Sequence, residues 1–125
     1  MVALRRETGE GPLVEAIGPE GFRVGTRRVP GGLMMTPDEA RDWSPPAVDA
    51  LGEGDFAWLL AMAPLPEFIL LGTGAALVRP LPLLVRAIEA RGTGLEVMDS
   101  RAAARAWGLL RAEGRHVGAA LYPLG

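Results

Sequence analysis

The sequence predicts an α/β fold. Residues 68–122 have the order strand, glycine loop, helix, strand, helix, strand. The run 68–71 (Phe-Ile-Leu-Leu) is apolar at every position, which is typical of a strand covered on both faces in a parallel sheet. Pro66 before the run and Gly72 after it make a helix unfavourable there. Strands that alternate with helices in this way predict the α/β class.

Turn residues divide the N-terminal third of the chain into short apolar runs. We expect strands over residues 13–17, 22–26, 27–29 and 33–35, separated by the turn signals Gly18-Pro19-Glu20-Gly21, Gly25-Thr26 and Pro30-Gly31-Gly32. Short connections of this kind join antiparallel neighbours. The first third of the chain is therefore predicted to form a small antiparallel β layer.

Capping residues and prolines locate two short helices in the middle of the chain. Residues 36–39 (Thr-Pro-Asp-Glu) have the form of a capping box with proline at the first helical position. We expect a helical turn to begin there and to end at residues 43–46 (Trp-Ser-Pro-Pro). Asp55 is expected to cap a second short helix over residues 56–63, which Pro64 ends.

Two longer helices are predicted in the C-terminal half, one over residues 80–91 with Gly92 as its left-handed cap and one over residues 101–112. Their apolar residues recur at helical spacing. The inner faces are expected to be formed by Leu81, Leu84 and Ile88 in the first helix and by Ala103, Ala106, Trp107 and Leu110 in the second. Strands are expected over residues 95–98 and 116–122. The second of these is mostly small or apolar on both faces, so it is predicted to lie inside the sheet.

Length and composition limit the classes of protein to consider. A chain of 125 residues fits one domain with an apolar core, and we expect a flexible N-terminus over residues 1–11 followed by a single α/β domain over residues 12–125. The sequence has no cysteine and one histidine, which excludes disulfides, thiolate metal ligands and multi-histidine metal sites. The formal net charge of −2 lacks the basic excess of a general nucleic-acid binder. All 13 basic residues are arginine, a bias that either a GC-rich genome or an anion-binding role would produce.

The distribution of apolar residues predicts a soluble, cytoplasmic protein. The longest apolar stretch, residues 56–71, is interrupted by Pro64, Pro66 and Glu67, whereas spanning a bilayer takes roughly 20 apolar residues. Residues 1–11 carry charges where a signal peptide needs an apolar core. The absence of cysteine is compatible with a reducing compartment. We expect no insertion into a membrane.

Gly72, Thr73 and Gly74 lie between a buried strand and the following helical segment, where α/β proteins commonly bind ligands. Glycines let a backbone approach a ligand closely, and free N–H groups there can hold an anion. The third glycine of a dinucleotide fingerprint and the lysine of a phosphate loop are both missing. The loop is therefore either a tight turn or a contact for a ligand or partner.

Ser100 and Arg115 complete the candidate anion site. Ser100 follows the strand at 95–98, so it is expected to share one sheet edge with Thr73 if the two strands are parallel neighbours. Arg115 precedes the last strand, and its guanidinium can bind a carboxylate or a phosphate. The structural alternative is that Arg115 pairs with Glu113, with Glu96 or with the end of a helix.

The sequence predicts no catalytic residue. His116 is the only side chain that ordinarily titrates near neutral pH, and a lone histidine beside a strand usually has a structural role. The serines are Ser44 and Ser100, and neither lies in the context of a nucleophile elbow. Ser100, like Asp99 before it, suits the cap of the helix that follows. No metal or cofactor is expected.

Trp43, Pro45 and Pro46 form a candidate partner surface. The simplest role of Trp43, as of Trp58 and Trp107, is packing in the core or at its edge. An exposed tryptophan beside two prolines would instead indicate a surface for a protein partner, since aromatic residues are enriched at interfaces.

Several segments together resemble a known family. They are the strand and glycine loop at 68–74, the strand at 95–98 and the tail at 100–121, which has the sequence S-R-A-A-A-R-A-W-G-L-L-R-A-E-G-R-H-V-G-A-A-L. These segments resemble the small single-domain family that includes the mitochondrial respiratory complex I assembly factor three and the adipogenesis-associated domain proteins. The hairpin at 21–24 and Trp43 also fit, and the resemblance covers residues 12–123.

The resemblance implies a three-layer α/β fold with a central mixed sheet, and it implies no established catalysis or cofactor. Gly72 and Gly74 match the family's loop, Ser100 stands for its threonine, and Glu113 and Arg115 match its acid–base pair. The chain departs from the family where Trp107-Gly108 replaces Tyr-Asn. The loss of that asparagine amide removes a polar role from this helix face.

Two functions of different classes follow. The resemblance implies a non-enzymatic interaction module that assists the assembly or biogenesis of membrane-associated complexes, with protein partners such as membrane-complex subunits and no nucleic acid. It predicts an exposed apolar patch near Trp43 or Pro45. The alternative is a small-anion or metabolite-binding domain, or an enzyme, in which residues 72–74, Ser100 and Arg115 converge on one pocket. A homo-oligomer with unknown partners is a third interpretation.

Overall fold

A computed structural model describes residues 11–125, and the predicted flexible N-terminus lies outside this range except for Gly11. In the described residues the strands are β1 (Val14–Gly18), β2 (Gly21–Val24), β3 (Arg27–Val29), β4 (Gly32–Met35), β5 (Ala40–Trp43), β6 (Phe68–Gly72), β7 (Gly94–Met98) and β8 (Gly118–Leu121). The helices are the 3-10 helices η1 (Val48–Ala50) and η2 (Glu53–Phe56) and the α-helices α2 (Ala57–Leu60), α3 (Pro82–Ala90) and α4 (Ser100–Ala112).

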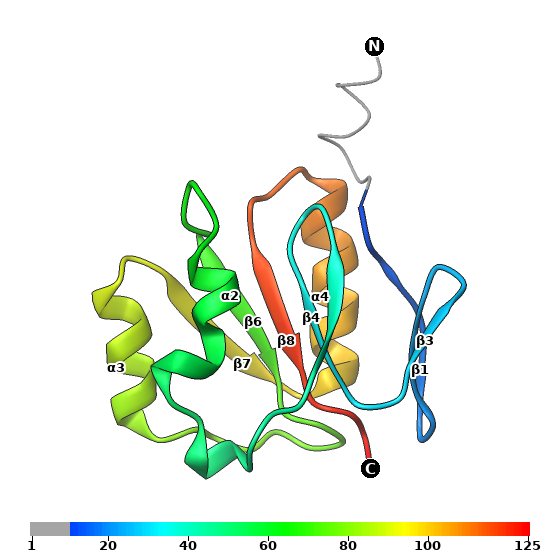
Figure 1. The fold of residues 1–125 in the computed structure, drawn as a ribbon, viewed down its shortest axis with the longest axis horizontal. Coiled ribbons are helices and arrows are strands. Elements are labelled where there is room, and N and C mark those ends of the chain that lie inside the picture. The colour runs from blue at the N-terminus through cyan, green and yellow to red at the C-terminus, as the bar shows by residue number, and fades with distance from the viewer. Residues whose placement is uncertain (1–10) are drawn as a thin grey trace.

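The strands form two sheets (Figure 1). The smaller sheet is antiparallel and has the order β1-β2-β3. The larger sheet is mixed and has the order β5-β4-β8-β6-β7. In it, β6 pairs in parallel with β7 and β8, whereas β4 is antiparallel to β5 and β8. Because β8 lies between β4 and β6, the end of the chain joins the N-terminal part of the sheet to the C-terminal part.

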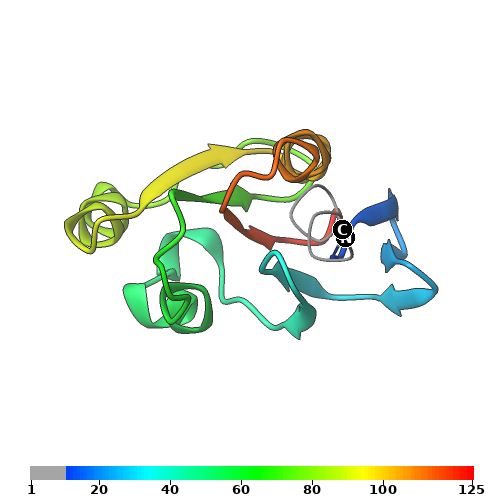
Figure 2. The same ribbon diagram turned by 90° about the horizontal axis from the view of Figure 1, so that it is seen from above.

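Other elements cover both faces of the larger sheet, and Figure 2 shows α2 and α4 on its opposite sides. On one face, η2, α2 and α3 bury a cluster that includes Phe56, Leu59, Ile69, Leu71, Leu84, Ile88 and Leu95. On the other face, α4 and the smaller sheet bury Phe22, Val29, Leu33, Leu70, Trp107 and Leu121. Successive residues of β6 enter opposite clusters because side chains alternate along a strand. This is the three-layer arrangement that the resemblance implied.

The structure confirms the α/β class and most of the predicted elements. The run at 68–71 is β6, a strand with neighbours on both sides, and β8 is buried at every position. The predicted antiparallel layer is present as β1, β2 and β3. Gly92 follows α3 with a φ of +95°, as expected of the predicted cap. Asp99 is the N-cap of α4, and its carboxylate accepts the N–H of Ala102 at 2.9 Å.

The helix predicted at residues 36–39 is absent, and this prediction is wrong. The segment is the turn between β4 and β5, and the chain continues as the strand β5. The hydroxyl of Thr36 accepts the N–H groups of Asp38 at 3.2 Å and Glu39 at 3.1 Å. A helix N-cap would accept the same kind of bond. The local pattern therefore fits both structures, and the pairing of β5 with β4 selects the turn.

Two further expectations need correction. The strand predicted at 33–35 is β4, which belongs to the larger sheet, where it pairs with β8 rather than with the small N-terminal layer. Asp55 does not precede its helix but lies inside η2, and its carboxylate accepts the N–H of Gly52 at 2.8 Å. The helix that follows is α2, which ends at Leu60 rather than at residue 63.

Candidate functional site

Ser100 links the glycine loop to the end of β8. Its hydroxyl donates to the carbonyl oxygen of Tyr122 at 2.7 Å and accepts the N–H of Gly74 at 2.9 Å. The N–H of Ser100 in turn donates to the carbonyl oxygen of Gly74 at 2.8 Å. The side chain is fully buried. Ser100 thus holds together the ends of β6, β7 and β8, as a buried hydroxyl with a satisfied donor and acceptor.

Packing and backbone conformation at this junction of strands require glycine at positions 72 and 74. A Cβ atom on Gly72 would lie 2.7 Å from Cδ2 of Leu121 and 2.9 Å from Cα of Ser100, closer than carbon atoms approach one another. Gly74 has a φ of +102°, a conformation that residues with a side chain rarely adopt. The glycine pattern therefore has a structural cause that needs no ligand.

Thr73 forms hydrogen bonds to the backbone of its own loop and of β7. Its N–H donates to the carbonyl oxygen of Met98 at 2.9 Å, which continues the pairing of β6 with β7. Its hydroxyl donates to the carbonyl oxygen of Ala76 at 2.7 Å and accepts the N–H of Val78 at 2.9 Å. The structure thus brings together Gly72, Thr73, Gly74 and Ser100, but the polar groups described at this edge bond one another. Anion binding by these four residues stays a prediction.

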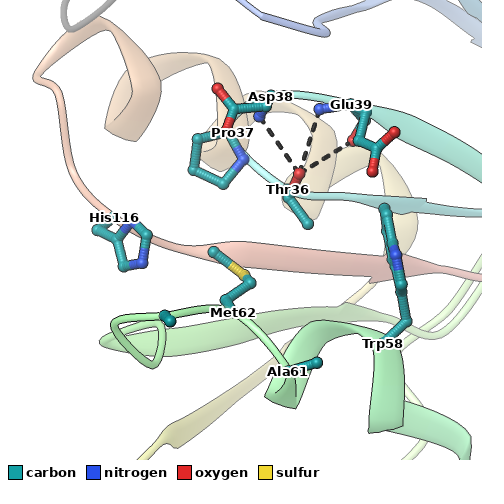
Figure 3. A pocket seen from close by; sticks show the side chains of 9 residues that line it. Thr36, Pro37, Asp38, Glu39, Trp58, Ala61, Met62 and His116 are labelled. Atoms are coloured by element: carbon teal, nitrogen blue, oxygen red, sulfur yellow. Dashed lines mark hydrogen bonds between the residues drawn. The ribbon is translucent and has the colours of Figure 1, made fainter.

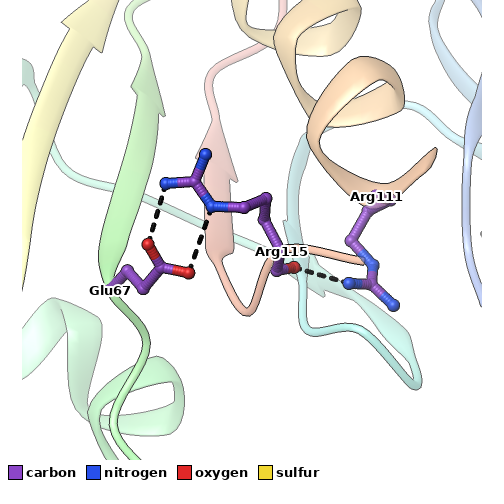
Figure 4. A network of polar contacts seen from close by, with 3 residues as sticks. All are labelled: Glu67, Arg111 and Arg115. Atoms are coloured by element: carbon purple, nitrogen blue, oxygen red, sulfur yellow. Dashed lines mark hydrogen bonds and ion pairs between the residues drawn. The ribbon is translucent and has the colours of Figure 1, made fainter. Parts of the chain in front are cut away.

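Arg115 does not join this cluster, and the expectation that it converges with the glycine loop is wrong. Its guanidinium lies at the opposite end of β6, where Nε is 3.2 Å from Oε2 of Glu67 and Nη2 is 2.8 Å from Oε1 (Figure 4). Glu67 directly precedes β6, whereas Gly74 follows it. The pairing partner is Glu67 rather than Glu113 or Glu96, because the sheet places the start of β6 beside the start of β8.

The pair formed by Glu67 and Arg115 shifts the ionisation of both groups. The hydrogen bond from Arg115 is the main reason that the pKa of Glu67 lies below its ordinary value of 4.5. The hydrogen bond to Glu67 likewise raises the pKa of Arg115. Both side chains are close to half exposed, so water screens their attraction. The contact is a structural ion pair at the surface.

Arg111 is a buried arginine that the sequence interpretation missed. It lies in the last turn of α4, and its Nη1 donates to the carbonyl oxygen of Arg115 at 2.5 Å (Figure 4). A cation is favourable at the end of a helix because the free carbonyl groups there carry partial negative charge. The signal was its position four residues after Trp107, on the same inner face.

His116 lies beside an open groove of about 280 Å³ that faces the β4–β5 turn (Figure 3). Trp58 and Met62 are among the apolar residues that line it, and Asp38 and Glu39 contribute carboxylates. Nε2 of His116 is 2.8 Å from the carbonyl oxygen of Pro64, so the ring has a hydrogen bond within the fold. The geometry gives His116 a structural contact, as its isolation in the sequence suggested.

Trp43 packs at the edge of the core. Its ring centroid is 6.1 Å from that of Phe56, with the two rings tilted. The centroid is 5.3 Å from that of Tyr122, and those two rings meet edge-on. The hydroxyl of Tyr122 donates to the carbonyl oxygen of Pro46 at 2.6 Å. Burial, followed by the nearby Asp55 and Asp49, raises the pKa of Tyr122 to about 12. Trp43, Pro45 and Pro46 are each half-buried, and their role as a partner surface stays a prediction.

The large exposed apolar side chains in the described part of the chain concentrate elsewhere. Four of them, within seven residues, are at least 46% exposed: Leu77 (48%), Val78 (46%), Leu81 (50%) and Leu83 (68%). They occupy the segment before α3 and its first turn, and we call these four residues the α3 surface. Sequence reasoning placed the apolar patch near Trp43 instead. The signal for the exposed residues was a Leu/Pro-rich run longer than one inner helix face requires. The expectation that Leu81 lies on the inner face of the helix is wrong, because α3 begins only at Pro82 and Leu81 is 50% exposed.

A metal site and a membrane-spanning helix are both absent from residues 11–125. No group of three or more histidine, cysteine, aspartate or glutamate side chains is placed to hold a metal ion there. The same residues contain no helix whose length and hydropathy would let it cross a membrane.

This geometry defines the class of protein, which is a small α/β domain with a mixed sheet. The polar groups at the glycine loop bond within the fold, and an apolar surface lies beside α3. The chain belongs to the family described as a protein of unknown function (DUF498/DUF598), whose sequence profile matches residues 14–122. The resemblance expected from the sequence is therefore confirmed.

Relatives of this chain include assembly factors of a respiratory complex. The chain is 31% identical over 120 residues to the bovine NADH dehydrogenase [ubiquinone] 1 alpha subcomplex assembly factor 3, an alignment that covers 96% of this chain and 65% of the bovine protein. It thus spans somewhat less than two thirds of that relative. It is 34% identical over 111 residues to an uncharacterized protein of Rhodobacter capsulatus, covering 89% of this chain and 84% of the relative.

Solved structures with the same fold include bacterial proteins. The chain is similar to a protein of Xanthomonas campestris, with a TM-score of 0.79 and 31% identity over 93% of this chain and 87% of that one. It is also similar to a Bordetella pertussis protein described as an Mth938-like domain, with a TM-score of 0.78 and 28% identity over 91% of this chain and 87% of that one. These likenesses agree with the predicted α/β fold.

Proposed function

We propose that this protein is a non-enzymatic interaction module that assists the assembly or biogenesis of membrane-associated complexes. The observation that carries the proposal is the α3 surface, where four large apolar side chains are at least 46% exposed within a seven-residue stretch. Concentrated apolar exposure on a small domain commonly marks a site of interaction with another protein. The relatives named as assembly factors support the same role.

The arrangement at the glycine loop favours this proposal over the alternative of a small-anion or metabolite-binding domain. The hydroxyls of Ser100 and Thr73 and the N–H of Gly74 are engaged within the fold. Arg115, the positive charge that the alternative relied on, lies at the other end of β6 and pairs with Glu67. A ligand at the loop would therefore have to displace bonds that hold the sheet end together.

The partners of the proposed module are proteins, among them subunits of membrane complexes, and the compartment in which it meets them is the cytoplasm. A second contact surface is proposed at Trp43, Pro45 and Pro46, since these half-buried residues present part of their apolar area at the end of β5. The α3 surface is the primary one because its side chains are more exposed.

Native co-purification tests the proposal. A tagged chain at its natural expression level is recovered from gently solubilised cells, and its partners are identified by mass spectrometry. We expect recovery of membrane-complex subunits that is reduced by Leu83→Ser and unchanged by Leu109→Ser. The control is matched because Leu109 is 69% exposed, almost the same as Leu83 at 68%. Recovery of the wild-type chain without partners would contradict the proposed function.

A further inference from the structure

The geometry points to a specific partner chemistry for the α3 surface: an apolar segment of a partner protein, flanked by carboxylates, packs along α3 and the residues before it. This inference rests on the proposed function and adds to it the place of contact and the kind of sequence that is bound.

Helix α3 is apolar on two sides but is covered on one. Leu84 and Ile88 are buried against the sheet, which accounts for the inner face. Leu83 is 68% exposed, and Ala87 and Ala90 follow it at helical spacings of four and seven residues. A helix with apolar residues around most of its circumference is usually one that is covered on all sides. The outer face of α3 is therefore suited to a further packing partner.

The residues before α3 extend the same surface in a preset conformation. Leu77, Val78 and Leu81 are each about half exposed, whereas Pro80 between them is buried and anchors the segment. Proline restricts the backbone, so Leu81, which lies between two prolines, loses little conformational freedom when a partner covers it. Rigid presentation of apolar side chains lowers the entropic cost of binding.

Charge selects the chemistry of the occupant. No aspartate or glutamate occurs between Glu67 and Glu89, and this stretch carries Arg79 and Arg86, which are both exposed. Arg86 lies three residues after Leu83 and so borders it on the helix surface. A partner segment with carboxylates beside its apolar residues would complement these arginines, whereas a basic segment would be repelled.

The surface is less suited to two other occupants. In a two-fold symmetric contact with a second copy of this chain, Arg79 and Arg86 of both copies would share one interface, where like charges repel. A bilayer with anionic lipids would attract Arg79 and Arg86, but beyond Leu83 the outer face of α3 offers it only the small apolar area of Ala87 and Ala90. Small side chains next to Leu83 instead leave room for the close approach of a protein backbone.

Site-specific photo-crosslinking tests this inference in cells. The variant Leu83→p-benzoylphenylalanine is expected to form a crosslink to one partner protein, within an apolar segment that contains aspartate or glutamate. The matched control, Leu109→p-benzoylphenylalanine, carries the probe at a position of the same exposure and is expected to form no such product. Adding Arg86→Glu to the first variant should reduce its crosslink about tenfold, because an attraction becomes a repulsion.

Several outcomes would overturn the inference. Crosslinks from position 83 to lipid, to a second copy or to a segment without carboxylates would each identify a different occupant. An absent crosslink at position 83, or an equal one from position 109, would show that the surface is not the site. If subunits still co-purify in that case, and Leu83→Ser does not reduce their recovery, the proposed function stands while this inference fails.

Discussion

The glycine loop and the α3 surface are close together in the sequence, yet they differ in what the fold leaves available. At the loop, the hydroxyls of Ser100 and Thr73 and the N–H of Gly74 are engaged in bonds with neighbouring strands and turns. At the α3 surface, Leu77, Val78, Leu81 and Leu83 are half exposed or more. The residues that look functional in the sequence form bonds within the fold, whereas these four apolar residues, which belong to no motif, stay exposed.

The largest effect on stability is expected from a substitution that disrupts the glycine loop. Gly72→Ala should destabilise the protein by about 3 kcal/mol, since its Cβ would meet both a buried leucine and the backbone of α4. Urea unfolding followed by circular dichroism measures the change. Gly108→Ala is the matched control, because no atom lies within 4 Å of its added Cβ and alanine favours a helix. It should stabilise by about 0.5–1 kcal/mol. Equal effects at the two positions would refute the packing role of Gly72.

Removing the hydroxyl of Ser100 should have the next largest effect. Ser100→Ala leaves the carbonyl oxygen of Tyr122 and the N–H of Gly74 without these bonds inside the protein, which should cost about 2 kcal/mol. Urea unfolding is again the measurement. Ser44→Ala changes an exposed serine, so a shift within about 0.5 kcal/mol is expected there. A stable Ser100→Ala variant would free the residue for the ligand-binding role that the sequence suggested.

The ion pair of Glu67 and Arg115 should produce a small, pH-dependent effect. The folded-state pKa of Glu67 is lowered, so its contribution to stability is present above its ordinary pKa of 4.5 and is lost as the pH falls through the lowered value. Glu67→Gln should therefore be slightly less stable than the wild type at pH 7 and equal to it at about pH 2. Urea midpoints across this range measure the difference. A stability difference between the variant and the wild type that stays constant with pH would exclude the ion pair as its cause.

The smallest effect on stability is expected at the α3 surface. Leu83→Ser should change the free energy of unfolding by less than about 0.5 kcal/mol, because the side chain is largely exposed. The same change should reduce partner recovery, so stability and binding separate at this position. Thermal unfolding of the purified variant, measured beside the co-purification, checks the first half. A strongly destabilised variant would mean that Leu83 supports the fold, which would remove the contrast with the loop.

Much of the fold could be predicted because its signals are local. The apolar run before Gly72, the cap at Gly92 and the N-cap at Asp99 each depend on neighbours in the sequence. The turn at 36–39 was missed because the bonds accepted by Thr36 suit a helix start equally well. Only the pairing of β4 with β5, a longer-range event, excludes the helix.

The candidate site was less predictable because its contacts join distant parts of the chain. Arg115 meets Glu67 across 48 residues, and no spacing in the sequence specifies that partner. Ser100 and Tyr122 meet across 22 residues, at the junction of three strands. The strand order β8-β6-β7 creates both contacts.

By itself, the sequence determined the α/β class, the central strands and the family, because period, caps and glycine positions are properties of neighbouring residues. The tertiary structure decided which side chains remain available. Leu83 and Leu84 are adjacent leucines in one helix, and one is 68% exposed while the other is 4% exposed. Helical spacing predicted that Leu84 is buried, but it could not predict that the face carrying Leu83 stays uncovered. The sheet covers one face of α3, and that coverage alone separates a core residue from a candidate contact.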